Sequence, residues 1–196
     1  TIMTGWRGAD VLAAHGIALQ IAAVIFMVPL GIGLSATVRV GQAYGANDGP
    51  GVRRAGLVAY ALGLVVMVSA TGLLLAIPET LIGLFMPVHA AGNVAVVAMA
   101  GKLLGIAAVF QLVDGAQVIG INALRGLADT RVPLVFAVLG YWGGGIGTAW
   151  LLGIRLGHGG PGIWAGLAVG LGVVAVLLAA RFYALSHRSS KLMTSL

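Results

Sequence analysis

Residues 111–122 read Gln111-Leu-Val-Asp114-Gly-Ala-Gln117-Val-Ile-Gly-Ile-Asn122, and they place one carboxylate inside a long apolar segment. At about 100° per residue, Gln111, Gln117 and Asn122 fall within roughly 80° of Asp114 on a helical wheel. An ionisable side chain at membrane depth is costly, so it normally faces a cavity and marks an ion or substrate path. The stretch therefore predicts a membrane-depth helix whose one polar face is built around one acid.

The composition indicates which solvent surrounds the chain. Of its 196 residues, 60% are hydrophobic and 8% are charged, with a mean hydropathy of +1.06. A soluble domain carries about 25% charged residues, so these charges are too few to cover a surface in water. We predict an all-α, polytopic membrane helix bundle. The net charge of +6 is assigned to cytoplasmic loops rather than to nucleic-acid binding, and the absence of cysteine excludes disulfides and thiolate chemistry.

Five apolar segments are each long enough to cross a bilayer, which takes about 20 residues. They are residues 11–44, 55–77, 94–124, 132–152 and 161–185. We expect the segments to form one transmembrane lobe over residues 1–196. Residues 1–6 carry no basic leader, and we expect them to be the tail of a sixth helix in a chain that begins partway through a longer bundle.

The positions of Lys and Arg predict the orientation of the five spans. One side receives Arg39, Arg53, Arg54, Arg125, Arg131, Arg181, Arg188 and Lys191, whereas the other receives Arg7, Lys102 and Arg155. Cytoplasmic loops carry the excess of basic residues. The C-terminus is therefore predicted to be cytoplasmic.

Proline and glycine predict where helices bend and where they approach closely. Pro29, followed by Gly31 and Gly33, is expected to kink the first span and to act as a hinge. Small residues four apart let membrane helices pack closely. Such stripes are Gly162-xxx-Gly166-xxx-Gly170, Gly140-xxx-Gly144, Gly143-xxx-Gly147 and Gly101-xxx-Gly105. We expect them to face neighbouring helices of the same chain rather than a second copy.

Polar residues in the first span have two interpretations. His15 and Gln20 could form hydrogen bonds between helices, which is the commoner role of polar groups in membranes, or they could line a cavity together with Gln111, Gln117 and Asn122. No enzyme signature accompanies them: the four histidines are far apart, and no Gly-x-Ser-x-Gly elbow or phosphate-binding loop occurs. We expect neither catalysis nor a metal site.

Asp114 also has two interpretations. It could be a buried clasp that is hydrogen-bonded to other spans, or it could couple transport to a proton or a cation. Burial disfavours the charged form of a carboxylate, whereas a nearby cation favours that form. An acid held between these influences can release a proton when a cation arrives, and we favour this second interpretation.

Two runs of sequence carry a resemblance to a known family. The first is Leu12-Ala-Ala-His15-Gly-Ile-Ala-Leu-Gln20 with Met27-Val-Pro29-Leu-Gly31-Ile-Gly33-Leu-Ser-Ala-Thr37-Val-Arg39-Val-Gly41-Gln42-Ala-Tyr-Gly45. The second joins Gln111-Leu-Val-Asp114-Gly-Ala-Gln117 to Ala123-Leu-Arg125-Gly-Leu-Ala-Asp129-Thr-Arg131-Val-Pro133. Both resemble the C-terminal lobe of bacterial multidrug and toxic-compound extrusion (MATE) transporters, although Gly16 stands where that family often has Gln.

The resemblance implies a twelve-helix antiporter of two six-helix lobes, which exports cationic or amphipathic compounds in exchange for Na⁺ or H⁺. By the same resemblance the five spans correspond to helices eight to twelve, and Asp114 takes the place of a cation-coupling carboxylate. It further implies a location in the bacterial inner membrane, a missing N-terminal lobe as partner, and no cofactor apart from the coupling ion. The alternatives are a lobe of a related lipid-linked oligosaccharide or polysaccharide flippase, and a truncated, non-transporting membrane fragment or structural subunit.

Overall fold

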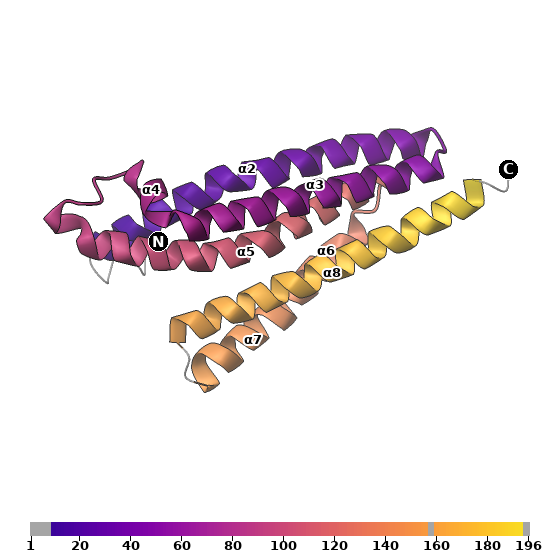
Figure 1. The fold of residues 1–196 in the computed structure, drawn as a ribbon. Helices are drawn as coiled ribbons and strands as arrows, with labels where there is room; N and C mark the ends of the chain where they lie inside the picture. Colours follow the sequence, from indigo (N-terminus) through magenta and orange to yellow (C-terminus); the bar gives the residue numbers. More distant parts are fainter. Residues whose placement is uncertain (1–8, 157–158, 194–196) are drawn as a thin grey trace. The chain divides into compact units, whose positions relative to one another are not determined.

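A computed structural model describes residues 9–156 and 159–193, and helices account for most of this part of the chain (Figure 1). No strand occurs among these residues, so the all-α prediction is confirmed for them. Five helical segments are long and apolar enough to cross a membrane: Leu12–Gly45, Gly49–Ala76, Val94–Gly126, Arg131–Trp150 and Gly166–His187. The proposed helix tail at residues 1–6 lies outside the described residues.

The helices follow one another in a simple order along the chain. In sequence they are α2 (Ala9–Gly45), α3 (Gly49–Ala76), α4 (Pro78–Gly83), the 3₁₀ turn η1 (Ala91–Asn93), α5 (Val94–Gly126), α6 (Arg131–Val138), the π-helix η2 (Leu139–Ile146), α7 (Gly147–Trp150), the π-helix η3 (Leu151–Arg155) and α8 (Gly159–Met193). The turns before α3 and before α6 each contain one non-glycine residue with positive φ, Asn47 at 56° and Ala128 at 58°.

Helix α3 begins at Gly49, within the segment expected to be the first loop. The Asp48 side chain accepts a hydrogen bond from the Gly51 backbone N–H at 2.9 Å, which satisfies one of the free donors at the helix start. Pro50 fits the first turn because its missing N–H would have no partner there. The cap and the proline together start the helix six residues before Ala55, the first residue of the expected span.

The fourth span differs most from a regular helix. Two stretches of π-helix, η2 and η3, interrupt it on either side of the short α7. Glycines 143, 144 and 145 fall within η2 and offer little resistance to the wider turn. Helix α8, in contrast, continues beyond residue 185, the expected end of the fifth span, because residues 186–193 contain neither Gly nor Pro to end it.

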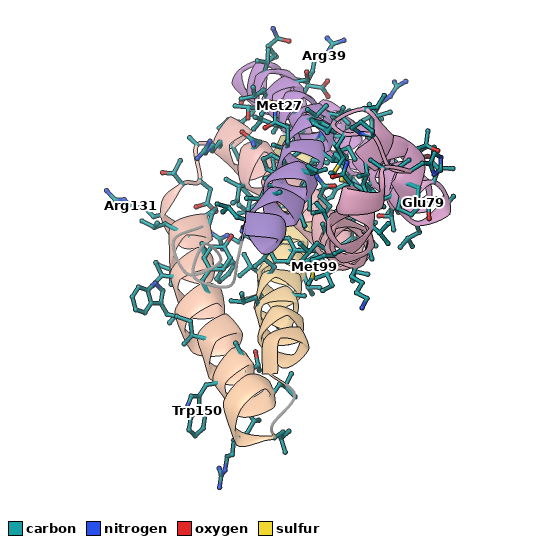
Figure 2. All side chains as sticks on the ribbon, turned by 90° about the vertical axis from the view of Figure 1, so that its left-hand side faces the viewer. Met27, Arg39, Glu79, Met99, Arg131 and Trp150 are labelled. Carbon is teal, nitrogen blue, oxygen red and sulfur yellow. The ribbon has the colours of Figure 1, made fainter. Side chains whose placement is uncertain are left out.

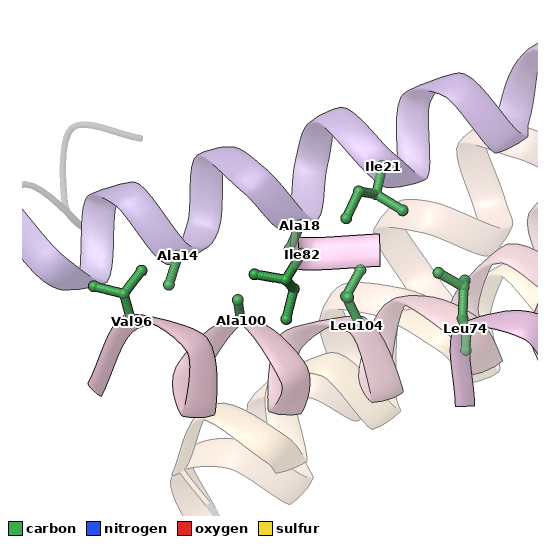
Figure 3. Packing of buried hydrophobic residues seen from close by; sticks show 9 residues of the cluster. Ala14, Ala18, Ile21, Leu74, Ile82, Val96, Ala100 and Leu104 are labelled. Carbon is green, nitrogen blue, oxygen red and sulfur yellow. The ribbon is translucent and has the colours of Figure 1, made fainter. Parts of the chain in front are cut away.

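The described chain divides into two compact units, which are treated separately. The first comprises residues up to Val28 together with Val66–Leu112. In its core, Ala14, Ala18 and Ile21 of α2 lie opposite Val96, Ala100 and Leu104 of α5, with Ile82 of α4 and Leu74 of α3 beside them (Figure 3). The alanines on both helices keep the facing side chains short, which permits close packing of the two backbones.

The second unit comprises Pro29–Val65 and Val113–Leu196. Its core joins buried side chains of α2, α3, α5, the turn after α5, and α8, namely Val40, Val52, Ala123, Leu124, Leu127, Val174, Leu178 and Phe182. Gly126 of α5 lies directly against α2, because a Cβ placed on it would come within 2.8 Å of the Thr37 carbonyl oxygen. Arg181 of α8 donates to Asp129 at 3.0 Å and thereby ties α8 to the turn between α5 and α6.

Many large apolar side chains outside these cores are exposed. Met27 is 59% exposed, Met99 39% and Trp150 52%, and Trp150 projects away from its helix (Figure 2). Such side chains suit a lipid environment, in which exposure of apolar surface carries no penalty.

Glycine stripes pack the fourth span against α8 in the second unit. A Cβ on Gly166 would come within 2.2 Å of the Ala149 backbone nitrogen, and one on Gly170 within 2.5 Å of the Gly145 Cα. The Thr148 hydroxyl donates to the Gly166 carbonyl at 2.9 Å across the same contact. The expected packing within the chain is confirmed for Gly166 and Gly170.

Other predicted stripes meet open space. Added Cβ atoms on Gly101, Gly105, Gly143 and Gly147 have no neighbouring atom within 4 Å, and the surroundings of Gly162 lie outside the description. Gly140 and Gly144 also face α8, so four of the eight stripe glycines that the structure describes serve contacts within this chain, and the other four leave helix surface uncovered by the described residues.

The contact at Gly166 can be tested with a matched pair of substitutions. Gly166→Ala should destabilise the bundle by about 1–3 kcal/mol, since the new methyl group meets backbone that cannot move aside. Gly147→Ala, in open space on the facing helix, should be neutral or slightly stabilising. The measurement is the midpoint of thermal unfolding in detergent. Equal midpoints for the two variants would contradict the packing described here.

Candidate functional site

Asp114 lies on α5, twelve residues before the end of that helix at Gly126. That separation is about 18 Å along the axis, which places Asp114 well inside a membrane-spanning segment. Its side chain is half-buried. No hydrogen bond or ion pair joins it to any other described residue, so its carboxylate is free to take a ligand.

The other acidic side chains that the structure describes have ordinary roles. Asp48 caps α3, Asp129 pairs with Arg181, and Glu79 is exposed in the first turn of α4. Among these residues, Asp114 is the acid that lies inside a long apolar helix and has no hydrogen bond or ion pair.

Gln117 lies one turn from Asp114 on α5, at the i+3 position where side chains share a face. Its Nε2 donates to the Tyr141 hydroxyl on η2. Its Oε1 is buried and has no partner among the described residues. By this spacing, the carboxylate of Asp114 and the unpaired carbonyl oxygen of Gln117 belong to one face of α5, and oxygen ligands of this kind suit hard cations.

Asn122 joins two helices in the second unit. Its backbone carbonyl accepts a hydrogen bond from the Thr37 hydroxyl at 2.8 Å, its Oδ1 lies 3.2 Å from the same hydroxyl, and its Nδ2 donates to the Val118 carbonyl at 2.9 Å. Gly33 leaves room for this side chain, because a Cβ there would lie 2.9 Å from Nδ2. Asn122 thus fastens α5 to α2, and its cavity-lining role stays a prediction.

Three predicted residues lie in the first unit and are not placed relative to Asp114. Gln111 is buried, donates to the Ala22 carbonyl of α2, and keeps an unpartnered Oε1. His15 is half-buried and Gln20 is exposed. Pro29 is buried within α2, which continues past it, and the division between the units crosses α2 immediately before it.

A groove that the sequence did not reveal lies between α3 and α8 in the second unit. It has a volume of about 470 Å³ and is lined by Arg53, Leu57, Tyr60, Val176, Ala179, Ala180, Phe182, Tyr183 and Ser186. None of the predicted site residues lines it. Its α3 wall has the spacing i, i+4, i+7, which marks one helix face, but the pattern alone does not indicate that α8 leaves that face open.

The site contains no metal-binding cluster. No group of three or more His, Cys, Asp or Glu residues lies close enough to hold a metal ion anywhere in residues 9–156 and 159–193.

Comparison with known proteins identifies the family. The MatE family model matches residues 1–151. The multidrug resistance protein NorM of Burkholderia vietnamiensis is 51% identical over 183 residues, which are 93% of this chain and 39% of that protein. The probable multidrug resistance protein NorM of Brucella suis is 47% identical over 181 residues, 92% of this chain and 38% of that protein.

Solved structures share the fold. The crystal structure of the eukaryotic MATE transporter AtDTX14 matches with a TM-score of 0.73 at 19% identity, covering 92% of this chain and 40% of that one. An inward-facing multidrug resistance MATE family transporter of the MOP superfamily matches with a TM-score of 0.72 at 17% identity, covering 89% and 39%.

These matches and the five membrane-length helices define a polytopic membrane helix bundle. The chain belongs to the MatE family. The resemblance seen in the sequence is therefore confirmed, and with it the prediction that the chain is not an enzyme. The chain spans about two fifths of the length of the curated relatives it matches.

The hydrogen bond between Gln117 and Tyr141 can be tested by its contribution to stability. Tyr141→Phe should lower stability by about 1–3 kcal/mol, because it leaves both ends of a buried amide without partners. Tyr44→Phe is the control, since the Tyr44 side chain is exposed and bonded to no described residue. Thermal unfolding in detergent compares the two variants. A Tyr141→Phe protein as stable as the control would show that Gln117 does not depend on this bond.

Proposed function

We propose that this chain is the C-terminal lobe of a secondary active antiporter that exports cationic or amphipathic compounds in exchange for Na⁺ or H⁺. Family membership and the names of its NorM relatives support multidrug efflux as the general activity. The observation that carries the coupling role is Asp114, an acid inside a membrane-spanning segment with no partner among the described residues.

The proposed mechanism follows from the chemistry of this carboxylate. Without a neighbouring cation, a half-buried acid favours its neutral, protonated form; with a Na⁺ or a cationic substrate beside it, the ionised form is favoured. The carboxylate therefore holds either a proton or one of these cations, and binding of the cation displaces the proton. Gln117 Oε1, one turn away, supplies a second oxygen to the same ligand.

Transport also needs a second lobe. Many secondary transporters enclose their substrate near the bilayer midplane between two repeats, which rock against each other. The length of the relatives supports an N-terminal lobe as the partner of this chain. In this proposal Pro29 is a hinge of α2, and Gln111, Asn122, His15 and Gln20 line the path as secondary polar groups.

The coupling role is tested in a two-lobe protein, made by joining residues 1–196 to the N-terminal lobe of the Burkholderia vietnamiensis relative. Asp114→Asn should abolish ion-driven export of a cationic dye while expression stays normal, since it removes the titration but little volume. Asp114→Glu should retain part of the export. The assay is dye efflux from cells or vesicles under an imposed Na⁺ or H⁺ gradient.

Glu79→Gln is the matched control, because it removes an exposed carboxylate outside the candidate spans. It should export at the rate of the unmodified protein. Full export by Asp114→Asn at normal expression would refute the coupling role. Loss of expression with Asp114→Leu, combined with normal export by Asp114→Asn, would instead identify Asp114 as a structural clasp.

The proposed location is the bacterial inner membrane, with the C-terminus in the cytoplasm. Reporter fusions after Asp48, after Asp129 and at the C-terminus should report the cytoplasm, because these sites lie on the side with eight of the eleven Lys and Arg residues. A fusion after His89 should report the outside. An external C-terminus would overturn this orientation.

A further inference from the structure

The groove between α3 and α8 plays no part in the proposed transport mechanism, and its chemistry points to a ligand of its own. We propose that it binds one anionic phospholipid, with the headgroup phosphate at Arg53 and an acyl chain along the apolar wall. This site is independent of Asp114 and of transport.

The walls of the groove suit an acyl chain. Nearly all of its lining is apolar, provided by Leu57 of α3 and by Val176, Ala179 and Ala180 of α8, with the rings of Tyr60 and Phe182 packed together at 6.2 Å between centroids. The lining of α8 runs from Val176 to Ser186, ten residues or about 15 Å along the axis. That length is half of a hydrocarbon core of about 30 Å, which is the depth of one leaflet.

The charge at one end of the groove suits an anionic headgroup. Arg53 is exposed, has no carboxylate partner among the described residues, and lies over the Tyr183 ring at 5.8 Å from the centroid. The ring holds the guanidinium beside the groove, and a phosphate accepts two parallel hydrogen bonds from such a group. The neighbouring Arg54 is exposed as well but does not line the groove.

The position of Arg53 along the chain agrees with a headgroup. It lies in the first turns of α3, near the loop that the distribution of basic residues assigns to the cytoplasmic side, and basic pockets between helices on that side favour anionic lipids. The part of α8 that lines the groove lies toward the C-terminal end of that helix, and the proposed orientation places this end on the cytoplasmic side too. A protein helix seated in the groove would cover the apolar wall but would balance the Arg53 charge only if it carried an acidic side chain at that point.

The test is native mass spectrometry of the 196-residue chain in detergent, titrated with phosphatidylglycerol or with phosphatidylcholine of the same acyl chains. We expect one phosphatidylglycerol to bind about tenfold more tightly than phosphatidylcholine, because both lipids carry a phosphate but the choline cation offsets its charge and weakens the attraction to Arg53. Arg53→Gln should remove this preference and Arg53→Lys should restore most of it. Arg54→Gln, which removes the same charge beside the groove, should leave the preference unchanged.

A second pair of variants tests the acyl-chain wall. Ala180→Phe fills the groove and should lower the binding of both lipids, whereas Ala184→Phe, one turn further on the exposed surface of α8, should not. Matching elution volumes in size-exclusion chromatography establish that each variant is folded. Equal loss with Arg53→Gln and Arg54→Gln would reduce the effect to diffuse charge and overturn the proposal. Unchanged lipid binding by Ala180→Phe, or a change in its oligomeric state alone, would overturn it too.

Discussion

The absence of water around the spans is the constraint on which the rest of this structure depends. In lipid a polar group has no solvent to bond to, so it must find a partner inside the protein. Three threonines follow this rule: Thr37 bonds to Asn122, Thr71 to the Ala108 carbonyl and Thr148 to the Gly166 carbonyl. Each of these bonds joins two helices within one unit, and glycine or alanine lies beside them wherever backbones approach most closely.

Against this background the unpaired oxygens are informative. Asp114 has no partner among the described residues, and the Tyr60 hydroxyl and the Oε1 atoms of Gln111 and Gln117 are buried without one. An unsatisfied polar atom in such surroundings costs free energy. Proteins keep such atoms mainly where a ligand or an ion visits, which is why we assign coupling to Asp114 rather than to Asp129, whose charge Arg181 already balances.

The sequence predicted the helical class and the number of spans because apolar segments of this length have one stable form in lipid. It also singled out Asp114, since one acid in a long apolar run is visible without coordinates. It did not predict the π-helical turns around α7, because glycine permits several backbone geometries and the choice depends on packing against α8. The partner of Gln117 and the groove at Arg53 likewise depend on contacts between segments far apart in the chain, which no local pattern specifies.

The central claim is that the Asp114 carboxyl changes its ionisation when a cation is exchanged. Infrared difference spectroscopy of the two-lobe protein in lipid, with and without a cationic substrate, measures this directly. Carboxyl bands should change on addition of substrate, and these changes should be absent from the Asp114→Asn spectrum. Difference spectra in which the carboxyl region is the same in both proteins would contradict it.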